Sequence, residues 1–387
     1  MPTAEVLDLI RSLIAFPTVS RDSNMALIAF VQDHLARHGV VSRLFPDAMG
    51  AKANLLASIG PLDRPGILLS GHSDVVPVEG QSWSRDPFRA EIDGGRLHGR
   101  GACDMKGFLG LMLALVPILV EKRLKAPVHL AFSYDEEVGC AGVRSLADHL
   151  AHLETKPAFA LIGEPTEMRI VTAHKGIEVV RTEIRGRAGH SSLPEAGANA
   201  LLAMGEFLVF LEGLAEELAK APRDDRFDPP YSSLNPGTLS GGNAVNIVAE
   251  HAVLEWEFRP LPDVDPEAIL GKAIDFAQRR LLPKLKSRAP ESGIRFTRIA
   301  SAPALSGADN GDAETLMRRL IGANESHAVS FTTEAGIFET MSGIPAIVCG
   351  PGSIAQAHKA DEYVTLDQLD RAARMLGALA DLAERGL

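Results

Sequence analysis

The stretch GILLSGHSD, residues 66–74, runs from apolar residues directly into a histidine and an aspartate. VHLAFSY (128–134) and FALIGE (159–164) are similar apolar runs, and acids stand at or just after their ends. Short apolar runs of this length predict buried strands. Between and before them, apolar residues recur at a spacing close to 3.6, which predicts helices at 23–38, 105–124 and 141–152.

This alternation predicts an α/β fold up to about residue 175, with a mostly parallel sheet and helices on both faces. Such sheets bind ligands at the carboxyl ends of their strands, where the polar residues of this chain stand. Beyond residue 176 the pattern changes, because 177–187 and 252–260 alternate like half-exposed strands, each followed by a helical segment. We expect an α+β domain built on an open antiparallel sheet there.

The α/β pattern returns near residue 315, so the middle block is expected to be inserted into the first domain. We therefore predict a discontinuous catalytic domain of residues 1–176 and 301–387, interrupted by a second domain of residues 177–300. A length of 387 residues agrees with two domains.

The composition narrows the choice of partners and compartment. The formal net charge is −11 and the basic residues are dispersed, which argues against a nucleic-acid or anionic-membrane surface. The longest apolar stretch, 108–120, is too short to cross a bilayer and predicts a buried helix. Three cysteines without a CxxC motif, and an acidic N-terminus without a signal-peptide pattern, predict a reduced, cytoplasmic protein.

His72 and Asp74 lie two residues apart at a predicted strand end and therefore share a face. They could be a metal ligand and the carboxylate that holds its second ring nitrogen, or a sheet-edge histidine beside a turn-forming acid. Asp104, in GRGACDMKG, could bridge two metal ions or cap the helix that follows. Taken singly, each residue leaves both interpretations open.

Glu136 and Glu137 follow the second apolar run in DEEVG, and Glu164 ends the third in LIGEP. Adjacent acids resist joint ionisation, so a bound cation is favoured over a solvated acidic turn. His358 alone would be an ordinary surface histidine. Two metal ions that share one carboxylate, however, need one histidine and one further carboxylate each. The set supplies these ligands and leaves one acid as a general base.

The whole chain resembles the M20 family of dinuclear-zinc amidohydrolases and peptidases, whose motifs occur in order and at the family's spacing: SGHSDVVP, GRGACDMKG, DEEVG, IGEPT, AGHSS and GPGSIAQAHKADEY. The resemblance implies two Zn²⁺ ions per subunit, with Co²⁺ as a possible substitute. It implies ligands in two groups that share one aspartate: His72, Asp104 and Glu164, then Asp104, Glu137 and His358. Glu136 would then be the base, and Asp74 would orient His72.

The resemblance also implies a catalytic domain interrupted by a lid that dimerises, and so a homodimer formed through the lid. His190, in AGHSS, matches a lid histidine that stabilises the oxyanion, usually across the dimer. Arg259 and Asn246 match lid residues that bind the substrate. Glu334 and Gly352 lie in loops that the family places beside the acyl amino acid.

Within the family, TEAGIF (333–338) and GPGSIAQAHKADEY (350–363) look most like the acetylornithine deacetylases. The expected reaction is hydrolysis of N2-acetyl-L-ornithine to L-ornithine and acetate, a step of arginine biosynthesis, and Glu334 is our hypothesis for binding the δ-ammonium group. The alternatives are a broader N-acyl amino acid deacylase, a succinyl-diaminopimelate desuccinylase, and a metal- or peptide-binding relative without catalysis. A phosphate-handling two-metal enzyme would want a basic clamp, and only Lys106 and Lys175 are near.

Overall fold

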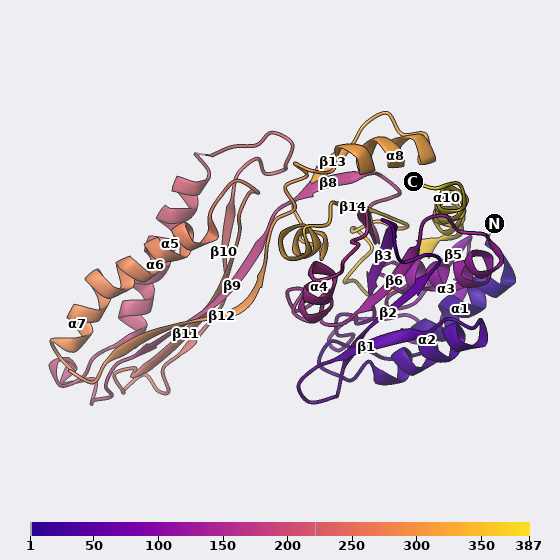
Figure 1. Cartoon of the computed structure of the whole chain (residues 1–387). Coiled ribbons are helices and arrows are strands. Elements are labelled where there is room, and N and C mark those ends of the chain that lie inside the picture. Colours follow the sequence, from indigo (N-terminus) through magenta and orange to yellow (C-terminus); the bar gives the residue numbers. More distant parts are fainter. Residues whose placement is uncertain (1, 221) are drawn as a thin grey trace. The chain divides into compact units, whose positions relative to one another are not determined.

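The computed structural model describes residues 2–220 and 222–387, which form two compact units (Figure 1). The first unit consists of the chain up to His174 together with Leu305–Ala328 and Thr333–Leu387. The second unit consists of Lys175–Ala304 and Val329–Thr332, and it is inserted into the first. Each unit has its own cluster of buried apolar residues, so burial of apolar surface stabilises each one separately.

A central sheet organises the first unit, and its strands are β1 (Ser42–Pro46), β2 (Ala53–Ile59), β3 (Ile67–His72), β6 (Val128–Ser133), β7 (Phe159–Pro165), β8 (Val171–His174), β13 (His327–Val329) and β14 (Ala346–Gly350). Their order is β1-β2-β6-β3-β7-β14-β8-β13. The adjacent strands β6, β3, β7 and β14 run parallel, whereas β1, β2 and β8 join antiparallel. A smaller sheet combines β4 (Glu91–Asp93), β5 (Arg96–His98) and β15 (Tyr363–Thr365).

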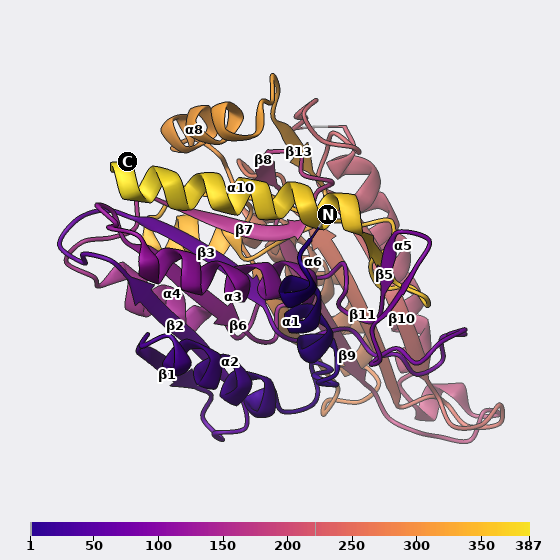
Figure 2. The same ribbon diagram turned by 90° about the vertical axis from the view of Figure 1, so that its right-hand side faces the viewer.

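Helices cover both faces of the central sheet: α1 (Ala4–Ile14), α2 (Met25–Arg37), α3 (Lys106–Glu121), α4 (Arg144–Ala151), α8 (Gly311–Ile321), α9 (Ala335–Ile337) and α10 (Leu366–Arg385). On one face α10 and α3 lie side by side (Figure 2), and α1 and α2 contact α3, while α4 lies on the opposite face (Figure 1). α3 is apolar on nearly every side because it is buried under α1 and α10. In residues 2–220 and 222–387 no helix has the length and apolarity needed to cross a bilayer.

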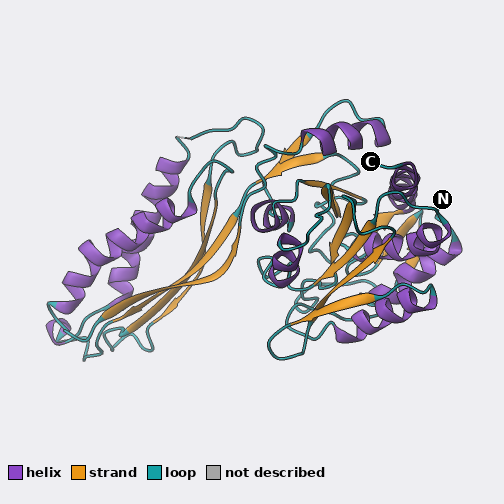
Figure 3. Ribbon diagram, in the orientation of Figure 1, coloured by secondary structure: helices purple, strands orange, loops and turns teal. Residues whose placement is uncertain are grey.

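The second unit is an antiparallel sheet with helices on one face (Figure 3). Its strands are β9 (Ile177–Arg185), β10 (Ser233–Gly241), β11 (His251–Arg259) and β12 (Gly293–Ala302), in the order β10-β11-β9-β12. Its helices are α5 (Ala200–Leu218), α6 (Pro266–Phe276) and α7 (Leu282–Lys286), with a short 3-10 turn at Pro194–Ala196. Alternate residues of β9 and β11 are buried, which is why their sequences alternate.

The predicted fold class is confirmed, but several elements were not expected. β10 reads SLNPGTLSG and is exposed over most of its length, so it lacks the apolar alternation that marks β9. The helical segment expected after 252–260 is divided by a π-helical turn, Ala277–Leu281, close to Pro283. Proline has no N–H to continue the ladder of helical hydrogen bonds, which favours such a widened turn.

Candidate metal centre and active site

The predicted site residues of the first unit meet at one edge of the central sheet. β3, β6, β7 and β14 are parallel, so the loops after them leave the sheet on the same side. His72 ends β3, and Glu164 lies near the end of β7. The structure brings six side chains together there, from these strands and the loops: His72, Asp104, Glu136, Glu137, Glu164 and His358.

Asp104 stands between the two histidines. Its Oδ1 atom lies 2.9 Å from His72 Nε2, and its Oδ2 atom lies 3.4 Å from His358 Nε2. Each histidine also has a second carboxylate. Glu164 Oε1 lies 3.8 Å from His72 Nε2, and Glu137 Oε2 lies 2.9 Å from His358 Nε2. Asp104 thus offers one oxygen to each of two clusters, as a carboxylate that bridges two metal ions does.

The donor set fits divalent metal ions. Among the described residues, the buried Oε1 atoms of Glu137 and Glu164 have no hydrogen-bond partner, which is costly unless a cation binds them. Ligand atoms of His72, Glu136 and Glu164 lie within 4.8 Å of one another, and so do those of His72, Asp104 and Glu137. Imidazole and carboxylate ligands suit Zn²⁺ and Co²⁺. The first group contains Glu136, so distance alone allows this residue to be a ligand as well as a base.

Burial and charge alter the protonation of the site. Burial raises the pKa of Glu137 to about 7, and it raises the pKa of Glu136 and Glu164 well above the ordinary value. Burial also opposes ionisation of Asp104, but hydrogen bonds with the two histidines hold its pKa below the ordinary range. The hydrogen bonds that His358 makes with Asp104 and Glu137 raise the pKa of this histidine to about 10. A site where acids resist ionisation and histidines retain protons is short of positive charge, which a divalent cation would supply.

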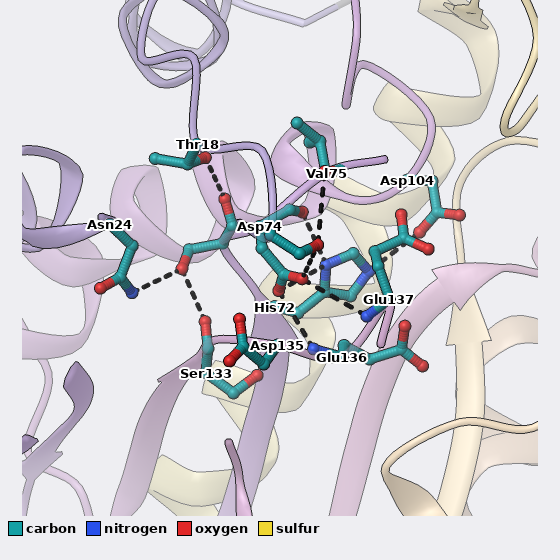
Figure 4. Close-up of polar contacts among 12 residues, drawn as sticks. Thr18, Asn24, His72, Asp74, Val75, Asp104, Ser133, Asp135, Glu136 and Glu137 are labelled. Atoms are coloured by element: carbon teal, nitrogen blue, oxygen red, sulfur yellow. Dashed lines mark hydrogen bonds and ion pairs between the residues drawn. The ribbon is translucent and has the colours of Figure 1, made fainter. Parts of the chain in front are cut away.

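Asp74 supports two parts of the site (Figure 4). His72 Nδ1 lies 2.9 Å from the backbone carbonyl oxygen of Asp74 and 3.6 Å from its carboxylate. The ring therefore donates from Nδ1 to the carbonyl and presents Nε2 to the ligand cluster. The carboxylate accepts hydrogen bonds from Ser20 Oγ at 2.7 Å and from the backbone N–H groups of Glu136 and Glu137 at 3.2 and 3.4 Å. Asp74 thus fixes the turn that carries both glutamates.

Figure 4 also shows how the two adjacent glutamates differ. The carboxylate of Glu137 is turned towards Asp104, and that of Glu136 is turned away from it. Cys140 Sγ lies 3.5 Å from Glu136 Oε1 and can donate to it. This divergence suits two different roles for neighbouring acids.

Sequence reasoning missed the polar residues that hold the end of β3. Thr18 Oγ1 donates to the carbonyl oxygen of Ser73 at 2.5 Å, and Asn24 Nδ2 donates to Ser73 Oγ at 2.9 Å (Figure 4). Ser73 Oγ in turn donates to the carbonyl oxygen of Ser133 at 2.6 Å. One sequence pattern could have pointed to Thr18 and Asn24. They stand in the mostly polar run TVSRDSN (18–24) before a helix, which is typical of helix caps.

Glu334 and Gly352 also lie in the first unit. Glu334 is 1% exposed, and Ser70 Oγ on β3 lies 3.5 Å from its Oε2 atom. Burial raises its pKa to about 7. Gly352 has φ +95°, and a Cβ atom there would come within 2.5 Å of Cys103 Sγ, so a larger residue would strain the loop beside Asp104. Contact of either residue with a substrate stays a prediction.

The remaining predicted site residues lie in the second unit. His190 is exposed, and its Nδ1 atom accepts a hydrogen bond from the backbone N–H of Ser192 at 3.2 Å. A neutral ring held in this way carries its proton on Nε2. The backbone carbonyl of Asn246 accepts a hydrogen bond from the residue after His190, at 3.1 Å. Arg259, the last residue of β11, donates to Glu257 at 3.0 Å.

Curated relatives align with nearly the whole chain. Acetylornithine deacetylase of Pasteurella multocida (strain Pm70) is 32% identical over 380 residues, which covers 96% of each chain. Acetylornithine deacetylase of Shigella sonnei (strain Ss046) is 34% identical over 368 residues, which covers 92% of each chain.

Solved structures share the fold. An M20 family metallo-carboxypeptidase of Sulfolobus solfataricus has a TM-score of 0.78 at 19% identity, covering 99% of this chain and 100% of that one. A dinuclear metal binding peptidase of the M20 family from Bacillus subtilis has a TM-score of 0.64 at 16% identity, covering 99% and 98%. Residues 68–382 match the family model itself. This protein therefore belongs to the hydrolases of peptidase family M20/M25/M40.

Proposed function

We propose that this protein is a dinuclear zinc amidohydrolase that converts N2-acetyl-L-ornithine and water to L-ornithine and acetate. The observation that supports the proposal most directly is Asp104, whose two carboxylate oxygens each face one histidine of the site. The acetylornithine deacetylases that align with nearly the whole chain support the substrate class.

Two pairs of ligands, bridged by Asp104, would each hold one Zn²⁺: His72 with Glu164, and Glu137 with His358. Cations bound there would supply Lewis acidity, which polarises an amide carbonyl and acidifies a water molecule. Glu136 is the proposed general base: it accepts the proton of the attacking water and later delivers it to the leaving amine. Burial supports this role, because it raises the pKa of Glu136 well above the ordinary value and so makes the carboxylate a stronger base.

His190 is the proposed oxyanion donor. Its hydrogen bond from Ser192 leaves Nε2 as the protonated nitrogen, which can donate to the developing charge. One well-placed donor of this kind contributes about 3–4 kcal/mol to the transition state. Arg259 and Asn246 are proposed to bind the carboxylate and carbonyl of the substrate. His190→Ala should therefore lower kcat, and Arg259→Met should mainly raise KM.

Substrate choice is the part of the proposal that needs a direct test. Chelator-treated protein with Zn²⁺ restored is assayed on N-acetylornithine, N-acetylmethionine and N-succinyl-diaminopimelate. The proposal expects the highest kcat/KM for N-acetylornithine. Equal values for N-acetylmethionine would favour the broader deacylase, and a preference for the succinyl substrate would favour a desuccinylase.

Glu334 is proposed to recognise the δ-ammonium group of the substrate. Because the carboxylate is buried, this contact requires it to become accessible when substrate binds. Glu334→Gln should then lower kcat/KM for N-acetylornithine more than for N-acetylmethionine. Equal losses on both substrates would remove Glu334 from recognition.

A homodimer formed through the second unit is also proposed. β10 lies at the edge of its sheet, so one side of its backbone has no strand partner among the described residues. Leu202 and Val209 on α5 and Leu239 on β10 are 71%, 69% and 50% exposed. An open edge beside apolar side chains suits pairing with a second copy. The molar mass measured by light scattering tests this proposal. Val209→Glu should shift the dimer towards monomer, and the matched control Val41→Glu in the first unit should not. A monomeric wild type would refute the proposal.

We further propose that the protein works in the cytoplasm. Its cysteines, Cys103, Cys140 and Cys349, are free and buried, which suits a compartment that keeps thiols reduced. Fractionation of cells that make the tagged protein tests this, and recovery from a membrane or secreted fraction would refute it.

A further inference from the structure

Glu362 is a buried acid four residues beyond the second histidine, and none of the roles above uses it. Its side chain is 1% exposed, yet each carboxylate oxygen accepts two hydrogen bonds. Oε1 accepts from the backbone N–H groups of Cys103 at 2.8 Å and Asp104 at 3.0 Å. Oε2 accepts from the N–H of Gly101 at 3.1 Å and from Arg100 Nη1 at 2.6 Å. One carboxylate therefore holds the turn that presents Asp104.

Arg100 connects that turn to the loop of His358. Its Nη1 atom donates to the carbonyl oxygen of Lys359 at 3.3 Å, and its Nη2 atom donates to Gln81 Oε1 at 2.5 Å. Gln81 Nε2 in turn donates to the carbonyl oxygen of His358 at 3.0 Å. The guanidinium also lies over the ring of Trp83, 4.9 Å from its centre. A planar guanidinium with several fixed partners defines the direction of each contact.

The two proposed cation positions differ in what holds their ligands. His72 ends β3, where it pairs with Ser133 of β6, and Glu164 belongs to β7, so both stand on strands of the central sheet. Asp104 and His358 stand on loops instead. His358 has φ +60°, a left-handed conformation that few residues with a side chain adopt. The loop-borne ligands therefore depend on contacts made by other side chains.

We propose that Arg100 and Glu362 form a clamp that positions Asp104 and His358. The clamp thereby sets the affinity for the second of two divalent cations, which is the one that Glu137 and His358 would hold. The inference rests on the proposed dinuclear site. The clamp residues are positioning residues, because they act through the backbone of the ligands. A merely structural ion pair would lower stability when broken, without a selective loss of one cation.

Glu362→Gln tests the clamp with little change in shape. The glutamine amide keeps one accepting oxygen, so its NH2 group would face either the N–H groups of Cys103 and Asp104 or those of Gly101 and Arg100, and the turn that carries Asp104 must shift. Losing a group that orients a metal ligand typically weakens metal binding about 10–100-fold. We expect a loss of that size for the cation of Glu137 and His358, and a clearly smaller loss for the other cation, which shares Asp104 but keeps His72 and Glu164 in their strand positions.

Glu339→Gln is the matched control. Glu339 also accepts hydrogen bonds from two backbone N–H groups of a loop, Ser306 at 2.8 Å and Gly307 at 3.2 Å. That loop carries none of the proposed ligands. The control should lower thermal stability and leave both cation affinities unchanged.

The measurement is a calorimetric titration of the chelator-treated full-length protein with Zn²⁺, repeated with Co²⁺ to follow its visible absorption. A selective loss for one cation in Glu362→Gln supports the clamp. Unchanged affinities, equal losses for both cations, or the same loss in Glu339→Gln would overturn it. If Glu362→Gln fails to fold, Glu362→Asp and Arg100→Lys replace it, because both keep the charges. Each should give a smaller loss of affinity for the same cation. The absence of a selective loss in both variants would overturn the clamp.

Hydrolysis of N-acetylornithine by the wild type is measured in parallel. Two tightly bound cations without hydrolysis would refute the proposed reaction and leave the clamp standing. If the wild type hydrolyses N-acetylornithine and Glu362→Gln binds both cations as the wild type does, the clamp is refuted and the proposed reaction stands.

Discussion

Replacing Glu334 with glutamine is predicted to stabilise the metal-free first unit at pH 8 and to change little at pH 5. Burial raises the pKa of this carboxyl from an ordinary 4.5 to about 7. Between these values the folded chain holds a proton that the unfolded chain has lost, so stability falls as the pH rises. A difference of about 2.5 in pKa, at about 1.36 kcal/mol for each unit, costs about 3 kcal/mol above pH 7. Glutamine has the same shape and no charge, so it removes this cost.

Urea unfolding at pH 5 and pH 8 measures the effect. Trp83 and Trp256 lie in different units, so a Trp256→Phe background leaves Trp83 as a fluorescent reporter of the first unit. Glu325→Gln is the control, because the Glu325 side chain is 79% exposed. An equal gain at both pH values, or no gain at pH 8, would refute the assignment of a buried carboxyl that titrates near neutrality. With Zn²⁺ restored the gain should shrink, because nearby positive charge stabilises the ionised form.

Three further changes, the last with a matched control, have defined outcomes. Glu136→Ala should lower kcat about 10²–10⁴-fold while bound metal, measured by atomic emission, stays unchanged; loss of one cation as well would make Glu136 a ligand. Burial lowers the pKa of His129 from 6.5 to about 4. Between these pH values the unfolded chain binds a proton at this histidine and the folded chain does not, so the free energy of unfolding should fall by about 3 kcal/mol as the pH drops from 6.5 to about 4. His129→Gln should remove this dependence in urea titrations. A Cβ atom at Gly163 would come within 2.0 Å of the Phe108 ring, so Gly163→Ala should cost at least about 1–3 kcal/mol in thermal unfolding. Gly205→Ala meets no atom within 4 Å and should stabilise by about 0.5–1 kcal/mol, so equal effects of the two changes would contradict the tight packing of Gly163 against Phe108.

The buried parts of the fold were predictable because burial leaves a mark on composition. β3 and β7 are buried at every residue, and their sequences are accordingly mostly apolar runs with a polar residue of the candidate site at or near the end. β10 was not predictable, since an exposed strand with a proline and two glycines resembles a loop.

The ligand candidates could be named from the sequence because each follows a buried run or stands in a distinctive motif. What holds them could not be named. The spacing of His72 and Asp74 suggested a contact through the carboxylate, whereas the nearer acceptor is the backbone carbonyl, which no side-chain pattern reveals. Glu362 looks like any acid near a surface motif, and its role depends on N–H groups more than 250 residues away, at separations of 258, 259 and 261.

The insertion of the second unit has a consequence for synthesis on the ribosome. His358 follows Glu164 by 358 − 164 = 194 positions, most of them in the inserted unit. At about 5–20 residues per second, the other candidate ligands are made about 10–40 s before the last histidine emerges. Where the chain leaves and re-enters the first unit, His174 and Leu305 exchange backbone hydrogen bonds of 3.2 and 3.0 Å. An insert that folds by itself can thus return the chain to its point of departure, so that the nascent sheet resumes where it stopped.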